Sequence, residues 1–94
     1  MNSYEMIVIL KPNTEEDLKK DVLQRLYDVI NENGKLGEVD DWGIRKLAYE
    51  INHIKEGNYV LINFEADPSI IKELERRSQI TDAIIKYLVV KKES

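Results

Sequence analysis

The first third of the chain changes from alternating to helical spacing of its apolar residues. Residues 3–10 (SYEMIVIL) are rich in β-branched and aromatic side chains and end at Lys11-Pro12-Asn13, which predicts a strand stopped by a turn. Thr14 precedes Asp17 by three residues, a spacing typical of a capping box at the start of a helix. Apolar residues then recur along one helical face at Leu18, Val22, Leu26, Val29 and Ile30. A helix is therefore predicted, with its end at Asn33-Gly34.

The rest of the chain predicts three more strands and a shorter helix. Residues 35–52 alternate loosely and indicate one long strand with an irregularity near Gly43, of the kind that a β-bulge produces. Residues 55–58 (KEGN) predict a hairpin turn into a strand over 59–66. Asp67-Pro68 is typical of a helix start, and the helical face that follows is formed by Ile70, Ile71, Leu74 and Ser78. The last strand is predicted over 83–91.

This order, βαββαβ, predicts an α+β protein with the ferredoxin-like fold. Right-handed crossovers would give a four-stranded antiparallel sheet in the order 4-1-3-2, with both helices on one face. At 94 residues, the chain is predicted to be a single domain over residues 1–94, because a second hydrophobic core would not fit. The last strand and the strand over 35–52 would form the two edges.

Alternation within the strands predicts which side chains face the helices. The inward set is Met6, Val8, Leu10, Val60, Ile62, Phe64, Ala66, Ile84 and Val89. The opposite, open face would carry Ile7, Ile9, Tyr59, Leu61, Leu88 and Val90, with Lys86 among them. Contiguous exposed apolar area of this kind usually marks an interaction site. The alternative is a facing assignment that is off by one on a strand.

Composition excludes several classes of function. The formal net charge is −4, there is no cysteine, and His53 is the one histidine, so neither a thiolate nor a histidine-cluster metal site is expected. No apolar run approaches the roughly 20 residues that span a membrane, and the first residues lack the features of a signal peptide, so a cytoplasmic location is expected. No glycine-rich phosphate loop or nucleophile with an oriented base is visible; we expect no enzyme and no cofactor.

RNA-binding domains with this topology stack bases on aromatic side chains of the two central strands. Here Ile7 and Ile9 occupy the outward positions of the first strand, and Glu56-Gly57-Asn58 stands where the basic-glycine-aromatic motif belongs. Stacking of bases on the sheet is therefore disfavoured. Any RNA contact is expected to use phosphates and basic side chains.

Four segments together carry a family resemblance: YEMIVILKPN, DDWGIRKLAYEIN, EGNYVLINFEA and DAIIKYLVVKK. In their order and spacing they resemble the sixth protein of the bacterial small ribosomal subunit. The resemblance implies a structural ribosomal protein without catalytic activity. It also implies binding to the central domain of 16S ribosomal RNA as a heterodimer with a small basic partner, the eighteenth protein of the same subunit.

The resemblance also assigns roles to residues. It implies a protein-partner surface at Trp42, Gly43, Arg45, Lys46 and Tyr49. The alternative for these charges is protection of an edge strand against unwanted pairing. The residues expected to contact RNA are Tyr4, Arg76, Arg77, Lys86, Lys91 and Lys92. For the two arginines, the alternative is an ordinary solvated helix end.

A second hypothesis for function is a ferredoxin-like ligand-sensing or oligomerisation module, which would use the same open apolar face. A tight homo-oligomer that ignores ribosomal RNA would favour this second hypothesis.

Overall fold

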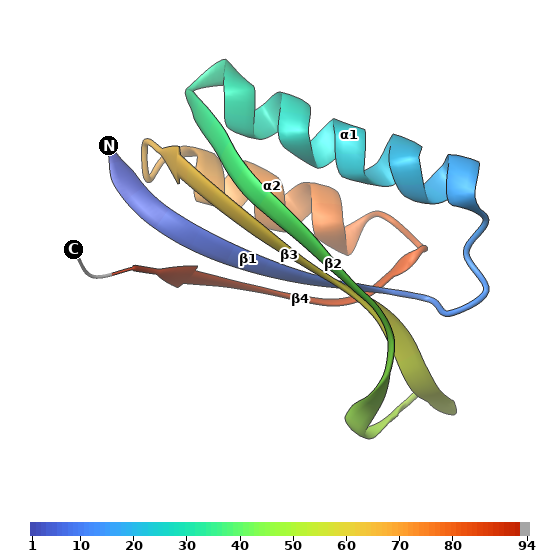
Figure 1. Ribbon diagram of the computed structural model, residues 1–94. Helices are drawn as coiled ribbons and strands as arrows, with labels where there is room; N and C mark the ends of the chain where they lie inside the picture. Colours follow the sequence, from blue (N-terminus) through green and yellow to red (C-terminus); the bar gives the residue numbers. More distant parts are fainter. Residues whose placement is uncertain (93–94) are drawn as a thin grey trace.

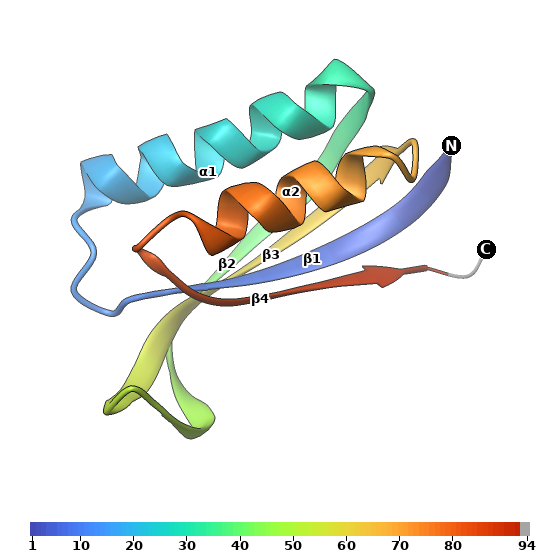
Figure 2. The same ribbon diagram turned by 180° about the vertical axis from the view of Figure 1, so that it is seen from behind.

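A computed structural model describes residues 1–92 of the chain, and its elements follow the predicted βαββαβ order (Figure 1). They are β1 (Asn2–Leu10), α1 (Glu16–Glu32), β2 (Gly34–Ile51), β3 (Ile54–Ala66), α2 (Ile70–Gln79) and β4 (Ile84–Lys91). The four strands form one antiparallel sheet in the order β2-β3-β1-β4, which confirms the predicted 4-1-3-2 arrangement. Both helices lie on the same face of the sheet (Figure 2). No helix within residues 1–92 is long and apolar enough to cross a membrane.

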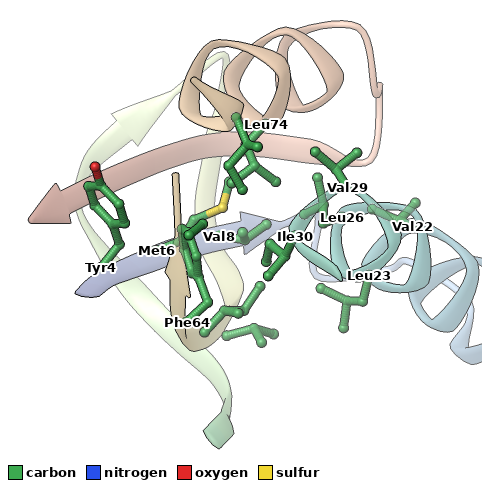
Figure 3. Packing of buried hydrophobic residues seen from close by; sticks show 14 of the residues in the cluster. Tyr4, Met6, Val8, Val22, Leu23, Leu26, Val29, Ile30, Phe64 and Leu74 are labelled. Carbon is green, nitrogen blue, oxygen red and sulfur yellow. The ribbon is translucent and has the colours of Figure 1, made fainter. Parts of the chain in front are cut away.

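The core lies between the sheet and the two helices, as the alternation predicted. Met6, Val8 and Leu10 of β1 and Val60 and Ile62 of β3 are fully buried. Figure 3 shows the apolar face of α1 packing against the same layer, through Val22, Leu23, Leu26, Val29 and Ile30. Each such side chain contributes about 1.5–3 kcal/mol when it is fully removed from water.

The blurred alternation of β4 has a structural cause. Ile9 pairs with Lys86, but the next residue, Leu10, pairs with Ile84, so the register shifts by one at Ile85. Because of this extra residue, Ile84 and Val89 both pack against the core although they differ by an odd number of positions. Lys86 faces the open side, as predicted, since it pairs with Ile9 there.

Three local predictions were wrong in detail. Thr14 does not cap α1, because its hydroxyl donates to the carbonyl of Lys11 (2.7 Å) and the helix begins at Glu16. The turn between β2 and β3 is not at residues 55–58 but at Asn52-His53, which have φ values of 50° and 68°. Asparagine tolerates this left-handed conformation better than most residues, so the turn falls there and β3 extends back to Ile54. The shorter helix also begins two residues late, at Ile70, although the Asp67 carboxylate does accept the amide of Ser69 (2.9 Å).

β2 and β3 are longer than the other two strands, and the end of this pair extends beyond the rest of the sheet. β2 and β3 form a ribbon whose last part, which we call the distal hairpin (residues 43–57), extends beyond the helices. Figure 1 shows it curling away on the side of the sheet that the helices do not cover. This curl brings the distal hairpin toward β4, and it shapes the open face of the sheet.

Candidate partner and RNA interface

The open face of the sheet is apolar, as predicted, and its most exposed part lies on β4. Leu88 and Val90 are 52% and 49% exposed, and Ile7, Tyr59 and Leu61 beside them are half-buried. Ile9 differs from the prediction because it is only 6% exposed. The distal hairpin covers it: a side chain at Gly57 would collide with Ile9, so glycine is what permits this close approach.

A β-bulge separates the flat part of β2 from the distal hairpin. The pairing register with β3 shifts between Asp41 and Gly43, and Gly43 has a φ of +76°. This confirms the irregularity predicted at Gly43. Nothing lies within 4 Å of the position that a side chain would take there, so the backbone conformation, not crowding, favours glycine.

Trp42 forms a small platform at the base of the distal hairpin. Its ring stacks on that of Tyr59 with centroids 6.4 Å apart and planes 15° apart, and it remains 38% exposed. The Arg45 guanidinium lies over the Trp42 ring, 5.3 Å from its centroid. Lys46 is exposed and lies opposite Glu56 in the backbone pairing of β2 with β3. The residues predicted for a protein partner therefore lie together along one edge.

Tyr49 connects this surface to β4. Its hydroxyl lies 3.0 Å from the Lys86 Nζ, and the same ammonium group is 5.2 Å from the Tyr49 ring centroid. This hydrogen bond is the main reason why the pKa of Lys86 lies above its ordinary value. A residue predicted to bind RNA and one predicted to bind a protein partner are thus in direct contact.

Arg76 and Arg77 occupy the last turn of α2 and share one carboxylate. Glu73 accepts two hydrogen bonds from Arg76, at 3.1 and 2.7 Å, and one from Arg77 at 2.7 Å. These hydrogen bonds lower the pKa of Glu73 to about 2, so the carboxylate is ionised throughout the neutral range. One of the two positive charges is therefore balanced within the helix.

The remaining predicted RNA contacts lie at the end of the sheet where the chain starts. Lys91 is exposed, and the Lys92 ammonium group is bound to the Asn63 side chain and lies 3.8 Å from Glu5. Tyr4, in contrast, is buried. Its ring faces the helices, is 6% exposed and stacks on Phe64 at 5.5 Å, because residue 4 shares the inward face with Met6 and Val8. It belongs to the hydrophobic core, and its contact with RNA stays a prediction.

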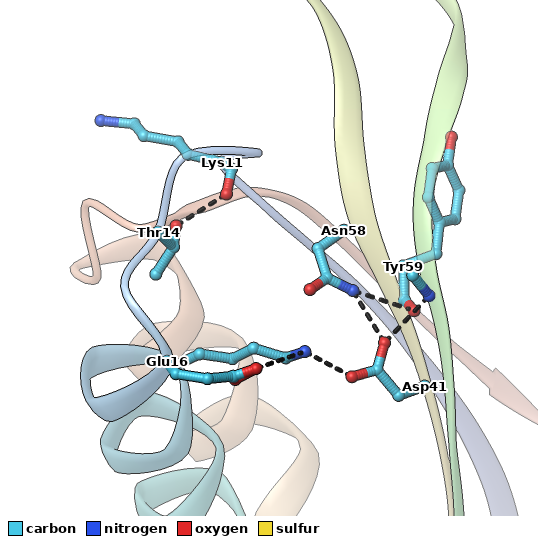
Figure 4. A network of polar contacts seen from close by, with 8 residues as sticks. Lys11, Thr14, Glu16, Asp41, Asn58 and Tyr59 are labelled. Atoms are coloured by element: carbon cyan, nitrogen blue, oxygen red, sulfur yellow. Dashed lines mark hydrogen bonds and ion pairs between the residues drawn. The ribbon is translucent and has the colours of Figure 1, made fainter.

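Sequence reasoning missed a polar cluster behind the bulge. The Asp41 carboxylate accepts from the Gly43 amide and from the Asn58 side chain, both at 2.9 Å, and it also pairs with Lys19 of α1 (Figure 4). A signal for the first contact exists, because an aspartate two residues before a glycine is typical of a side chain that bonds its own turn. The contacts to Lys19 and Asn58 join residues 22 and 17 positions away, which no local pattern reveals.

Comparison with known proteins agrees with this architecture. The family described as Ribosomal protein S6 matches residues 3–91. The small ribosomal subunit protein bS6 of Alkaliphilus oremlandii is 43% identical, and that of Clostridium perfringens (strain 13) is 47% identical, each over 99% of both chains. The crystal structure of 30S ribosomal protein S6 from Thermotoga maritima superposes with a TM-score of 0.89 at 33% identity, covering 97% of this chain and 87% of that one.

The fold and these relatives define a class: a ribosomal protein of the small subunit, with a ferredoxin-like fold and no enzymatic activity. Within this class, the chain belongs to the ribosomal protein S6 family. As a member it is a protein of the bacterial small ribosomal subunit.

Proposed function

We propose that the protein binds the central domain of 16S ribosomal RNA as a heterodimer with the eighteenth protein of the small subunit. The observation that carries this proposal is the open face itself. It combines exposed Leu88 and Val90 with the Trp42 platform and the distal hairpin, an apolar area next to an edge strand that bears two cations. Such a surface suits a protein partner better than an RNA backbone.

Electrostatics supports the need for a partner. The chain carries a formal charge of −4, and several of its candidate RNA-binding cations already have contacts within the protein, as Arg76 and Arg77 do with Glu73. Affinity for RNA depends strongly on how many phosphates are neutralised. A basic partner would supply the cations that this chain lacks, which favours joint binding.

The direct test is a titration of a 16S central-domain fragment with the protein alone, with the eighteenth protein alone and with both. We expect weak binding by the protein alone and strong, salt-sensitive binding by the pair, because phosphate contacts release counterions. Equal affinity with and without the partner would exclude the cooperative mechanism. A tight homo-oligomer that does not respond to the partner would favour the alternative, an oligomerisation module.

The role of the edge cations is tested separately with the double variant Arg45→Ala/Lys46→Ala. We expect it to lower partner affinity and raise self-association while the fold stays intact. Unchanged partner binding would leave these two side chains with edge protection alone. The matched control is Lys20→Ala/Lys72→Ala, which also removes two exposed cations, one from each helix.

A further inference from the structure

The Asp41 carboxylate holds together three elements at the root of the distal hairpin. One oxygen, Oδ1, accepts from the Gly43 amide and from Asn58 Nδ2, both at 2.9 Å. The other, Oδ2, pairs with the Lys19 ammonium group, whose side chain is only 12% exposed. Figure 4 shows the Asp41 carboxylate between α1 on one side and Asn58 on the other. β2, β3 and α1 therefore meet at a single side chain.

The first of these hydrogen bonds acts on the bulge. Gly43 has a φ of +76°, and the register shift lies between Asp41 and Gly43, so Oδ1 accepts from the backbone at the residue that carries the distortion. A bulge bends its strand and increases its twist, which sets the direction of everything beyond it. The distal hairpin begins at this point and leaves the plane of the sheet (Figures 1 and 2).

The positions of the side chains on the predicted partner surface depend on the direction in which the distal hairpin leaves the sheet. Arg45, Lys46 and Tyr49 lie beyond the bulge, and Trp42 and Gly43 lie at it. The hairpin has little apolar packing of its own to fix its orientation, since Ile44 and Tyr49 are 49% and 62% exposed. Its orientation therefore depends on the polar contacts at its root, together with the close approach of Gly57 to Ile9 and the hydrogen bond between Tyr49 and Lys86.

We propose that Asp41 is a positioning residue for the partner surface: by holding the Gly43 bulge through Oδ1, it fixes the orientation of the distal hairpin that the eighteenth protein meets. The bond to Asn58 anchors the same oxygen to β3, and the Lys19 pair ties the carboxylate to α1. This inference rests on the proposed function for the identity of the partner. The effect of Asp41 on the orientation of the hairpin in the free protein does not depend on the identity of the partner.

Four variants test the proposal. Asp41→Ala removes both acceptor oxygens, whereas Asp41→Asn keeps a side-chain oxygen that can accept from Gly43 and loses the charge. Lys19→Met removes only the tie to α1. Asp40→Ala is the matched control, because it makes the same change of charge at the exposed neighbouring position. Two quantities are measured for each: affinity for the eighteenth protein, and the residual dipolar couplings of amides 43–57 in the free protein.

We expect Asp41→Ala to weaken partner binding by about tenfold, the effect of losing one hydrogen bond to a charged group. The couplings of residues 43–57 should change in the same variant. Asp41→Asn should recover most of the affinity, and Asp40→Ala should stay within about twofold of the natural sequence, as surface substitutions do. Lys19→Met should also stay within about twofold, because both hydrogen bonds to Oδ1 remain in place. Recovery by the isosteric amide separates a positioning role from a loss of general stability.

The proposal would be overturned by partner affinity of Asp41→Ala equal to that of Asp40→Ala, or by unchanged hairpin couplings in Asp41→Ala. An Asp41→Asn variant as weak as Asp41→Ala would do the same, because the acceptor for Gly43 would then be irrelevant. Absence of binding by the natural sequence would instead exclude the proposed partner. In that case the couplings alone decide whether Asp41 orients the hairpin.

Discussion

The two ends of the β2–β3 ribbon are stabilised by different kinds of interaction. In the sheet, β3 alternates strictly, and Val60, Ile62 and Phe64 are buried beneath the helices. Beyond the bulge, the same ribbon carries exposed aromatic and charged side chains such as Tyr49 and Arg45. Apolar burial holds the first end, whereas the second is held mainly by hydrogen bonds, at its root and between Tyr49 and Lys86.

This difference separates stability from recognition within one pair of strands. Removing a few hundred square ångströms of apolar surface from water stabilises far more than an exposed hydrogen bond does. The distal hairpin can therefore change its side chains for a partner at little cost to the fold. Substitutions in the sheet should mainly lower the free energy of unfolding, whereas substitutions in exposed regions should mainly change affinity.

The largest effect is expected in the sheet. Ile62→Ala deletes a side chain with no exposed surface, so the free energy of unfolding should fall by about 2–5 kcal/mol. Leu88→Ala on the open face, where the side chain is 52% exposed, should change it by no more than about 0.5 kcal/mol. Urea denaturation measures both. Comparable losses would mean that the open face also stabilises the monomer.

At the bulge, the backbone conformation of Gly43 should determine how much a substitution lowers the free energy of unfolding. Gly43→Ala forces a residue with a side chain into a left-handed conformation, which costs about 1–2 kcal/mol, although no atom blocks the new methyl group. Gly43→Asn is the matched variant, because asparagine adopts this conformation more readily, and it should cost less. Thermal or urea unfolding compares the two. A neutral Gly43→Ala variant would indicate that the bulge can relax without loss.

These two regions also differ in how far the sequence predicted them. Within the sheet, strand alternation and helical spacing identified the buried residues, because burial imposes a period that one sequence displays. The same rule places Tyr4 on the inward face beside Met6, where it is 6% exposed, whereas its assignment to RNA came from family resemblance and stays a prediction.

The distal hairpin was less predictable because its geometry depends on contacts between distant residues. The Asp41–Lys19 and Tyr49–Lys86 contacts join positions 22 and 37 residues apart, and they exist only once β2 has bent. The turn was misplaced for a related reason. Gly57 looked like a turn residue, but it is required where the hairpin passes over Ile9.

A smaller effect is expected from acid at the root of the hairpin. Partial burial acts to raise the pKa of Asp41, but the hydrogen bonds from Lys19, Asn58 and the Gly43 amide outweigh it and hold the pKa below its ordinary value. The charged and titratable groups that face it are Lys19 and Tyr27 of α1, with Glu16 3.9 Å from the Lys19 ammonium group. A carboxyl with a lowered pKa in the folded state stabilises the protein above its unfolded pKa, near 3.9.

That contribution is lost as the pH falls through the folded-state pKa. The difference in unfolding free energy between the natural sequence and Asp41→Asn should therefore be present at pH 7 and shrink below about pH 4. Its size should be under about 1 kcal/mol, because the Asp41 side chain is 44% exposed and solvent screens the pair. Glu73 and Asp67 also have lowered pKa values, but they are common to both proteins and cancel. A difference that grows with acid would contradict this account.

The smallest effect concerns the arginines of α2 and extends the comparison from the hairpin to a second exposed region. Glu73→Gln removes the carboxylate that Arg76 and Arg77 share and leaves both cations free to meet phosphate. RNA affinity of the heterodimer should then rise by less than about fivefold, the scale of an exposed ion pair, and its salt dependence should steepen. Glu75→Gln makes the same change of charge in the same helix and serves as the control. An equal rise in both variants would reflect overall charge alone, whereas no rise in either would place Arg76 and Arg77 away from the RNA and return them to the role of an ordinary helix end.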